Sequence, residues 1–570
     1  MSAFYDIWIG TAAPHYKRSN NEDWQNVSGN IWYSLPGDKK FITVASNNEY
    51  QLTLIGQLYE TVDANELLNR CVNYIQQPDN NYTDAAGHYI IFVSALATGD
   101  TYVFTNRMGS YHAYWLEDGA ISTNYLALAT TKKQKKLNWE GITGFMAMGY
   151  FPDDSTYIKG ISIFEPATCY HFNSGSELID KKRYWQWQYH PEDKPLESHL
   201  ARLKDILQSS LAVSTNNFRT AIPISGGLDS RLLAGELSST DNHTYRDLNA
   251  FSYGYTADSP ELMIAGKIAE ARHIPIQLYQ LPNYLFQQID EIAESVELFQ
   301  YVDGTRQASA ADWLRQNADV VVGGHWGDVW MNDMGVDAKG DLLPAFQKKI
   351  IKKGSQWLLD NVCGQHTNNS SEYLSDYFQS FISRHNNIGN ADFLMKIYKT
   401  DQWSFRWTTA SLRMYQAAVM PVLPFYDSRI VDFFCTVPST TVNSRQMEIE
   451  YLKHYHKDLA KITWQEYDAD LYNYKYFNNR NIAYRAAKKL QRLATGEKPI
   501  QRNWEIFYMN PEGRKSLEAR LLNNSLLNEL VPANKIKELL DDLYNNPSAA
   551  NGYTVSMLLT FSIFLDKVFK

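Results

Sequence analysis

The fold is decided by the stretch Ala221-Ile222-Pro223-Ile224-Ser225-Gly226-Gly227-Leu228-Asp229-Ser230-Arg231. An apolar run of strand length leads into two glycines, and a helical pattern continues from Arg231 to Glu236. Glycines let the backbone approach a ligand closely, and the NH groups at the start of a helix attract an anion. The stretch therefore predicts a strand, a phosphate-binding turn and a helix in succession.

The polar residues of this turn suit a nucleotide and its metal ion. Hydroxyl groups of serine can donate hydrogen bonds to phosphate oxygens, and the carboxylate of Asp229 is a suitable ligand for Mg²⁺. The turn lacks the Gly-Lys-Ser/Thr ending of a Walker loop, and an empty strand-to-helix turn is the alternative interpretation. The candidate nucleotide-binding residues of the turn are Ser225, Gly226, Gly227, Leu228, Asp229 and Ser230.

The pattern around the turn is that of an α/β fold. Strands and helices are expected to alternate over 198–214 (helix), 218–224 (strand), 250–254 (strand), 260–272 (helix), 276–281 (strand) and 319–323 (strand). This alternation is typical of a doubly wound parallel sheet, in which ligands bind beyond the carboxyl ends of the strands. From Asp341 onward the pattern is almost entirely helical.

The first 190 residues have a different pattern. Short alternating apolar runs, broken by Gly, Asn and Asp, predict antiparallel strands, and residues 64–76 form a helical interval among them. The segment 185–195 is rich in polar residues and proline and is typical of a linker. We therefore expect two domains, an α+β sandwich over 1–190 and a parallel-sheet domain with a helical C-terminal part over 196–570.

Composition excludes several classes of function. The formal net charge is -9, and the lysine runs at 132–136 and 348–353 are short, so they are expected to be solvated faces and no nucleic-acid partner is expected. Four scattered cysteines suit neither a disulfide framework nor a zinc site. The start of the sequence does not resemble a signal peptide, and no segment has the length of apolar residues that a membrane helix needs. The nearest candidate, 553–565, is expected to be a buried terminal helix. A cytoplasmic location is expected.

The turn resembles the pyrophosphate loop of the N-type ATP pyrophosphatases, and specifically that of the asparagine synthetase superfamily. Three further segments resemble that family: Phe251-Ser252-Tyr253-Gly254, Asp319 to Asp328, and Pro424-Phe425-Tyr426-Asp427. The resemblance implies a glutaminase-like N-terminal nucleophile (Ntn) sandwich followed by an ATP pyrophosphatase domain. It also implies that Tyr253 and Gly324 lie at the nucleotide and that Asp328 joins Asp229 as a ligand of Mg²⁺.

The chemistry that the resemblance implies is amide-bond formation. ATP adenylates a carboxylate of a small molecule or peptide, pyrophosphate leaves, and an amine displaces AMP. Glutamine-dependent members of the family carry a cysteine directly after Met1, whereas this chain has Ser2. The N-terminal region is therefore expected to be a retained scaffold, with the amine supplied by a substrate as in β-lactam synthetases and lasso-peptide cyclases.

Two candidate catalytic residues follow from departures from the family pattern. His325 stands where the resemblance leads one to expect a Glu near the adenylate, and it suits equally a general base or a histidine hydrogen-bonded to backbone. Lys475 is the nearest candidate for the family's late lysine, against a solvent-facing lysine. Arg231 replaces a serine and either reaches an anion or faces outward.

Three functions remain open at this point. The first is a ligase whose amine comes from a source other than glutamine. The second is an asparagine synthetase that uses free ammonia, and the third is a nucleotide-binding relative without catalysis. The substrates and the oligomeric state are not fixed by the sequence.

Overall fold

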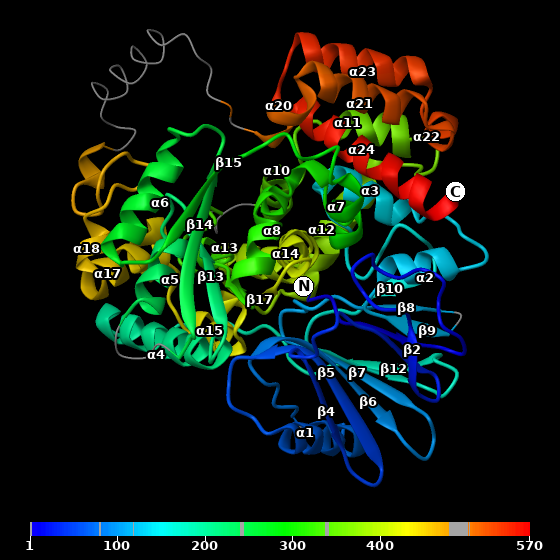
Figure 1. Ribbon diagram of the computed structural model, residues 1–570, viewed down its shortest axis with the longest axis horizontal. Coiled ribbons are helices and arrows are strands. Elements are labelled where there is room, and N and C mark those ends of the chain that lie inside the picture. The colour runs from blue at the N-terminus through cyan, green and yellow to red at the C-terminus, as the bar shows by residue number, and fades with distance from the viewer. Residues whose placement is uncertain are drawn as a thin grey trace.

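The computed structural model describes residues 3–78, 81–117, 119–239, 244–336, 341–477, 500 and 502–570. Figure 1 shows the N-terminal sheets, in blue and cyan, beside a central sheet in green, with the C-terminal helices in red and orange. The chain is a mixed α/β protein with antiparallel sheets in its N-terminal part and one parallel sheet, which confirms the expected fold class at this level.

The N-terminal region contains two six-stranded antiparallel sheets. The first has the order β10 (Ile161–Ile163), β8 (Tyr114–Leu116), β9 (Ala120–Ser122), β1 (Asp6–Ile9), β3 (Ile31–Ser34) and β2 (Gln25–Ser28). The second has the order β12 (Leu178–Arg183), β11 (Thr168–Phe172), β7 (Thr101–Thr105), β6 (Gly87–Ala95), β5 (Tyr50–Leu58) and β4 (Ile42–Ser46). Helix α1 (Ala64–Gln76) has the bounds expected from the sequence and packs its apolar side on the second sheet.

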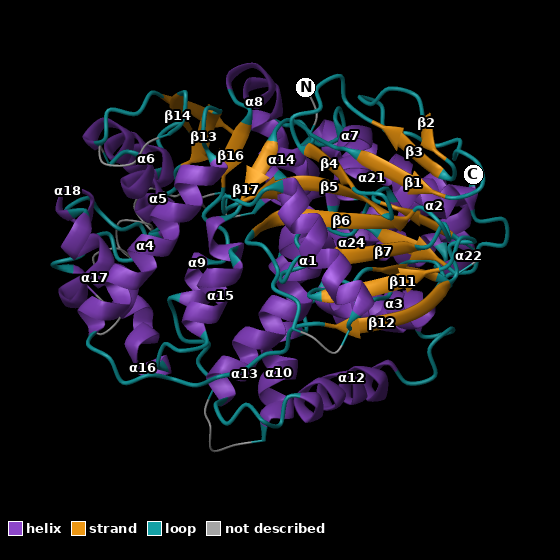
Figure 2. Cartoon of the chain, turned by 90° about the horizontal axis from the view of Figure 1, so that it is seen from below, coloured by secondary structure: helices purple, strands orange, loops and turns teal. Residues whose placement is uncertain are grey.

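The parallel sheet has five strands. Their order is β15 (Ile276–Gln280), β14 (Asp247–Gly254), β13 (Arg219–Pro223), β16 (Val320–Val322) and β17 (Met420–Val422). Helices α5 (Asp229–Leu237) and α6 (Pro260–Ala271) cover one face, and α8 (Ala311–Asn317) covers the other (Figure 2). The chain leaves β13 toward β14 on one side and later returns to β16 on the other, so the strand order reverses at β13. Such a reversal is where open α/β sheets bind ligands.

The C-terminal part is helical, as expected, apart from the short strand β17. Helices α20 (Asn503–Tyr508), α21 (Pro511–Leu522), α22 (Ser525–Leu530) and α23 (Ala533–Asn545) pack around α24 (Ala549–Phe569). Within the described part of the chain, α24 is the one helix long and apolar enough to cross a membrane, and 78% of its most apolar window is buried inside the protein.

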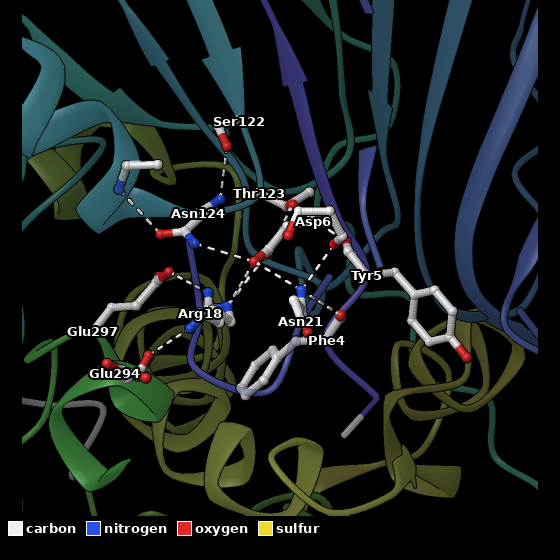
Figure 3. A network of polar contacts seen from close by, with 12 residues as sticks. Phe4, Tyr5, Asp6, Arg18, Asn21, Ser122, Thr123, Asn124, Glu294 and Glu297 are labelled. Atoms are coloured by element: carbon white, nitrogen blue, oxygen red, sulfur yellow. Dashed lines mark hydrogen bonds and ion pairs between the residues drawn. The ribbon is translucent and has the colours of Figure 1, made fainter. Parts of the chain in front are cut away.

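A buried network of charges joins the N-terminal region to the parallel-sheet region (Figure 3). Arg18 Nε lies 2.9 Å from Asp6 Oδ2, and Arg18 Nη2 lies 2.5 Å from Glu297 Oε1. Arg413 Nη2 lies 3.1 Å from the same Glu297 oxygen. Since these four side chains come from both parts of the sequence and are almost fully buried, the two regions share one charged core.

Candidate functional site

A cavity of about 440 Å³ opens at the carboxyl ends of β13, β14 and β16. It lies at the strand reversal, and the sequence pattern predicted ligand binding beyond the carboxyl ends of these strands. The predicted residues Ser225, Asp229, Ser230, Tyr253, Gly324, His325 and Asp328 all line it. Residues that the sequence did not single out also line it, among them Glu261, Arg306, Trp326, Lys399, Trp403, Trp407 and Tyr415.

The turn between β13 and α5 is held by its own serines. The Ser225 NH donates to Ser230 Oγ at 3.0 Å, the two serine hydroxyls lie 3.0 Å apart, and the Gly227 NH donates to Ser225 Oγ at 3.2 Å. Leu228 is the N-cap residue of α5, and no described side chain caps the helix there. The hydroxyls that were expected to face phosphate thus also fix the shape of the turn.

Glycine is required at position 226 for a packing reason. A Cβ atom placed on Gly226 would lie 2.8 Å from Gln465 Cβ, which cannot turn away as the end of that side chain can, and the Gln465 NH donates to the Gly226 carbonyl oxygen at 3.2 Å. Gly324 approaches the turn closely, since a Cβ there would lie 3.1 Å from Ser230 N. The space that these glycines leave is therefore occupied in part by other residues of the protein and not only by a ligand.

The two predicted aspartates lie next to each other in the lining of the cavity. The backbone NH of Asp328 donates to Asp229 Oδ2 at 3.2 Å, although the two residues follow different strands. Burial raises the pKa of Asp229 well above its usual value, the charges of Glu448 and Asp328 act in the same direction, and Arg445 opposes them. Carboxylate oxygens are hard ligands of the kind that Mg²⁺ takes, so the side chains of these two neighbouring aspartates are of a type that suits this ion. No group of three or more His, Cys, Asp or Glu side chains placed to hold a metal occurs among the described residues.

Arg445 is a site residue that the sequence pattern did not reveal. Its guanidinium forms ion pairs with Asp229 and, at 2.6 Å, with Glu448 Oε2. Arg445 and the preceding Ser444 both have positive φ, at 59° and 52°, a conformation that non-glycine residues rarely adopt. The Ser444 NH donates to Asp333 Oδ2 at 2.8 Å, which helps to hold this strained segment against the turn.

His325 is neutral in this environment. Burial lowers its pKa to about 4, while the charge of Asp328 acts in the opposite direction. The Nδ1 atom is buried and has no hydrogen-bond partner among the described residues. A neutral imidazole that faces a cavity has a nitrogen lone pair available to take a proton from a strongly acidic donor, but its lowered pKa makes it a weak base at neutral pH.

Part of the cavity lining is aromatic, and Arg306 lies among these rings. The guanidinium of Arg306 lies 5.3 Å from the ring centroid of Tyr253, and the hydroxyl of Tyr253 lies 3.2 Å from that of Tyr415. Arg306 forms no ion pair with any residue in the described ranges. Such a guanidinium is free to contact an anionic or planar group of a ligand.

Of the predicted nucleotide-binding turn, Gly226, Gly227 and Leu228 do not line the cavity. Lys475 and Arg231 lie elsewhere. Lys475 is exposed, its Nζ is 5.9 Å from the ring centroid of Tyr474, and it does not line the cavity. Arg231 neither reaches the cavity nor faces outward: it is buried and donates to the carbonyl oxygens of Leu459, Ile462 and Thr463. Ser2, the residue expected to replace the glutaminase cysteine, lies outside the described residues.

No model of a known protein family and no curated protein sequence matches the chain. Among solved structures, the chain is similar to the U34-tRNA thiolase NcsA from Methanococcus maripaludis, which was determined with its 4Fe-4S cluster. The identity is 13% and the TM-score 0.22, over 53% of this chain and 82% of that one.

Proposed function

We propose that the protein is an ATP-dependent ligase that adenylates a carboxylate and transfers the acyl group to an amine from a source other than glutamine. The observation that carries the proposal is the meeting of Asp229 and Asp328 beside the serine turn, in one cavity at the strand reversal of a parallel sheet. Asp229 and Asp328 would hold Mg²⁺, which neutralises charge on the phosphates when it is bound.

The residues of the chain have distinct parts in this reaction. The turn from Ser225 to Ser230 and the start of α5 orient the phosphates. A carboxylate oxygen of the substrate then attacks the α-phosphorus of ATP, and the bond to pyrophosphate breaks. In the second step the amine attacks the acyl carbon, AMP leaves, and the neutral imidazole of His325 takes the proton released from the amine nitrogen.

The decisive experiment is carboxylate-dependent exchange of labelled pyrophosphate into ATP, with a panel of carboxylic acids and the full chain. We expect exchange by the native protein and a loss of at least about a hundredfold in Asp229→Ala, because a ligand of the phosphate-bound ion is removed. Asp360→Ala, which changes an exposed aspartate, is the matched control. Absence of exchange with every acid, or unchanged exchange in Asp229→Ala, would refute the proposal.

One observation favours a second candidate, a nucleotide-binding protein without catalysis. Arg445 already pairs with Asp229 and so competes with a metal ion for its carboxylate. Calorimetry that detects binding of Mg-ATP, together with no release of AMP in the presence of any acid and amine, would support this candidate. An ammonia-dependent asparagine synthetase is distinguished by formation of asparagine and AMP from aspartate and ammonium.

A further inference from the structure

The cavity has a wall that lies outside every segment with a family resemblance. It is formed by the π-helical segment Lys399–Thr408, of which Lys399, Trp403, Trp407 and Thr408 line the cavity. Stretches of π-helix are rare and are frequently found at functional sites. The side chains of this wall are therefore candidates for contact with a ligand.

Two lysines lie against the indole ring of Trp403. Lys352 Nζ is 4.3 Å and Lys399 Nζ is 5.0 Å from its ring centroid. Both lysines are partly buried. Neither forms an ion pair or a side-chain hydrogen bond with any residue that the structure describes, so the indole is the one partner that they share there.

The ammonium groups of Lys352 and Lys399 are close enough to affect each other. Burial lowers the pKa of Lys352 to about 8, and the charge of Lys399 adds to this effect. Burial also lowers the pKa of Lys399, with Lys349 acting in the same direction and Asp328 in the opposite one. Asp392 acts on Lys399 in the same direction as Asp328, but neither lysine forms an ion pair with a described carboxylate. Partly buried charges in proteins are normally paired, so these two ammonium groups suit an anionic ligand.

Lys352 is not part of a solvent-exposed face, although the sequence predicted this for the lysine run to which it belongs. The run 348–353 was expected to be a solvated face, and Lys353 is indeed exposed, but Lys352 turns inward to Trp403. The NH of Lys352 donates to the carbonyl oxygen of Ala147 at 2.9 Å, which fixes the backbone at this point. The prediction was wrong for Lys352 because a packing partner 51 positions away cannot be read from a local charge run.

We infer that Lys399 contacts the two terminal phosphates of the nucleotide, the part that leaves as pyrophosphate, and that Lys352 strengthens the positive potential there from behind Trp403. This inference rests on the proposed function. Lys399 and Asp328 line the same cavity, and the charge of Asp328 acts on Lys399, so the lysine lies near the place where the two aspartates would hold the metal ion. A metal-bound polyphosphate has more negative charge than one divalent ion neutralises, and a lysine ammonium is a suitable partner for the remainder.

The test is isothermal titration calorimetry of the full chain in the presence of Mg²⁺, with inorganic pyrophosphate and AMP as separate probes. We expect Lys399→Met to weaken binding of pyrophosphate at least about tenfold and to leave binding of AMP within about twofold. Lys399→Arg keeps the charge and should retain most of the affinity. Lys352→Met should show a smaller loss, and Lys353→Met, which removes an exposed charge from the same run, should match the native protein.

The outcomes separate this inference from the proposed function. Native protein that binds neither probe overturns both. Native protein that binds both probes, with unchanged affinity for pyrophosphate in Lys399→Met, overturns the inference alone. Equal weakening of AMP and pyrophosphate also overturns it, because the lysine would then act on the whole cavity or on another anion such as the substrate carboxylate. If Lys399→Met does not fold, Lys399→Gln serves for the same comparison.

Discussion

His325 lines the cavity, and its buried Nδ1 has no partner among the described residues, so protonation of the folded protein is unfavourable at this position. The folded pKa is about 4, whereas an unfolded histidine titrates near about 6.5. Between these two values the unfolded chain binds a proton that the folded chain does not. The free energy of unfolding therefore falls as pH decreases from about 6.5 to about 4, by on the order of 2 kcal/mol from this residue.

We expect His325→Gln to have a shallower loss of stability over this pH range than the native protein, as measured by urea unfolding at pH values from about 4 to about 7. His15→Gln, which replaces an exposed histidine, is the control and should keep the native slope. Parallel curves for His325→Gln and the native protein would mean that His325 is protonated equally easily in the folded and unfolded states.

The site residues that could be predicted from the sequence are those that belong to a local sequence pattern. Asp229 and Asp328 each follow a recognisable strand, and the parallel sheet brings both strand ends to one edge. Arg445 and Lys399 had no such signal. Arg445 is 216 positions from the aspartate that it contacts, and its place depends on two left-handed residues that no propensity favours.

Among the elements, the strand, turn and helix around β13 were predictable because apolar runs, glycines and the helical period agree there. Helix α1 matched its expected bounds, and the strands of the parallel sheet differed from theirs by a few residues at most. The short strand β17 was not predicted. It has three residues, lies in a helical region of the sequence and pairs with β16 alone, so its existence depends on the tertiary fold.

Two glycines on neighbouring helices differ in the space around them, so the same substitution should have opposite effects on stability at the two positions. A Cβ on Gly235 of α5 would lie 2.7 to 2.8 Å from the buried imidazole of His456, whereas a Cβ on Gly266 of α6 would meet nothing within 4 Å. Alanine favours a helix by about 1 kcal/mol over glycine, but overpacking costs about 1 to 3 kcal/mol. We expect Gly266→Ala to stabilise the protein and Gly235→Ala to destabilise it in urea unfolding. Stabilisation by both would show that α5 can move away from His456.

For the whole molecule, the charged network between the two regions determines whether they behave as one unit (Figure 3). Glu297 Oε1 accepts from Arg18 and Arg413, and its Oε2 accepts from the hydroxyl of Tyr114 at 2.8 Å. These partners come from three segments far apart in the sequence. Burial raises the pKa of the neighbouring Asp6, while the charges of Arg18 and Arg413 oppose that shift. The stability of the network therefore depends on carboxylates that balance the charges of the two arginines.

Removal of one carboxylate charge should therefore weaken the contact between the regions. Glu297→Gln keeps the shape of the side chain but leaves two buried arginines with Asp6 as their main counter-charge, and breaking a buried pair costs about 3 to 5 kcal/mol. We expect a lower urea midpoint with an unchanged slope, in one transition. Glu294→Gln on the same helical segment, whose carboxylate accepts from the exposed Ser19, should change the midpoint little. Equal effects of the two variants, or separate transitions in the native protein, would mean that the regions are held together by their apolar contacts and not by this network.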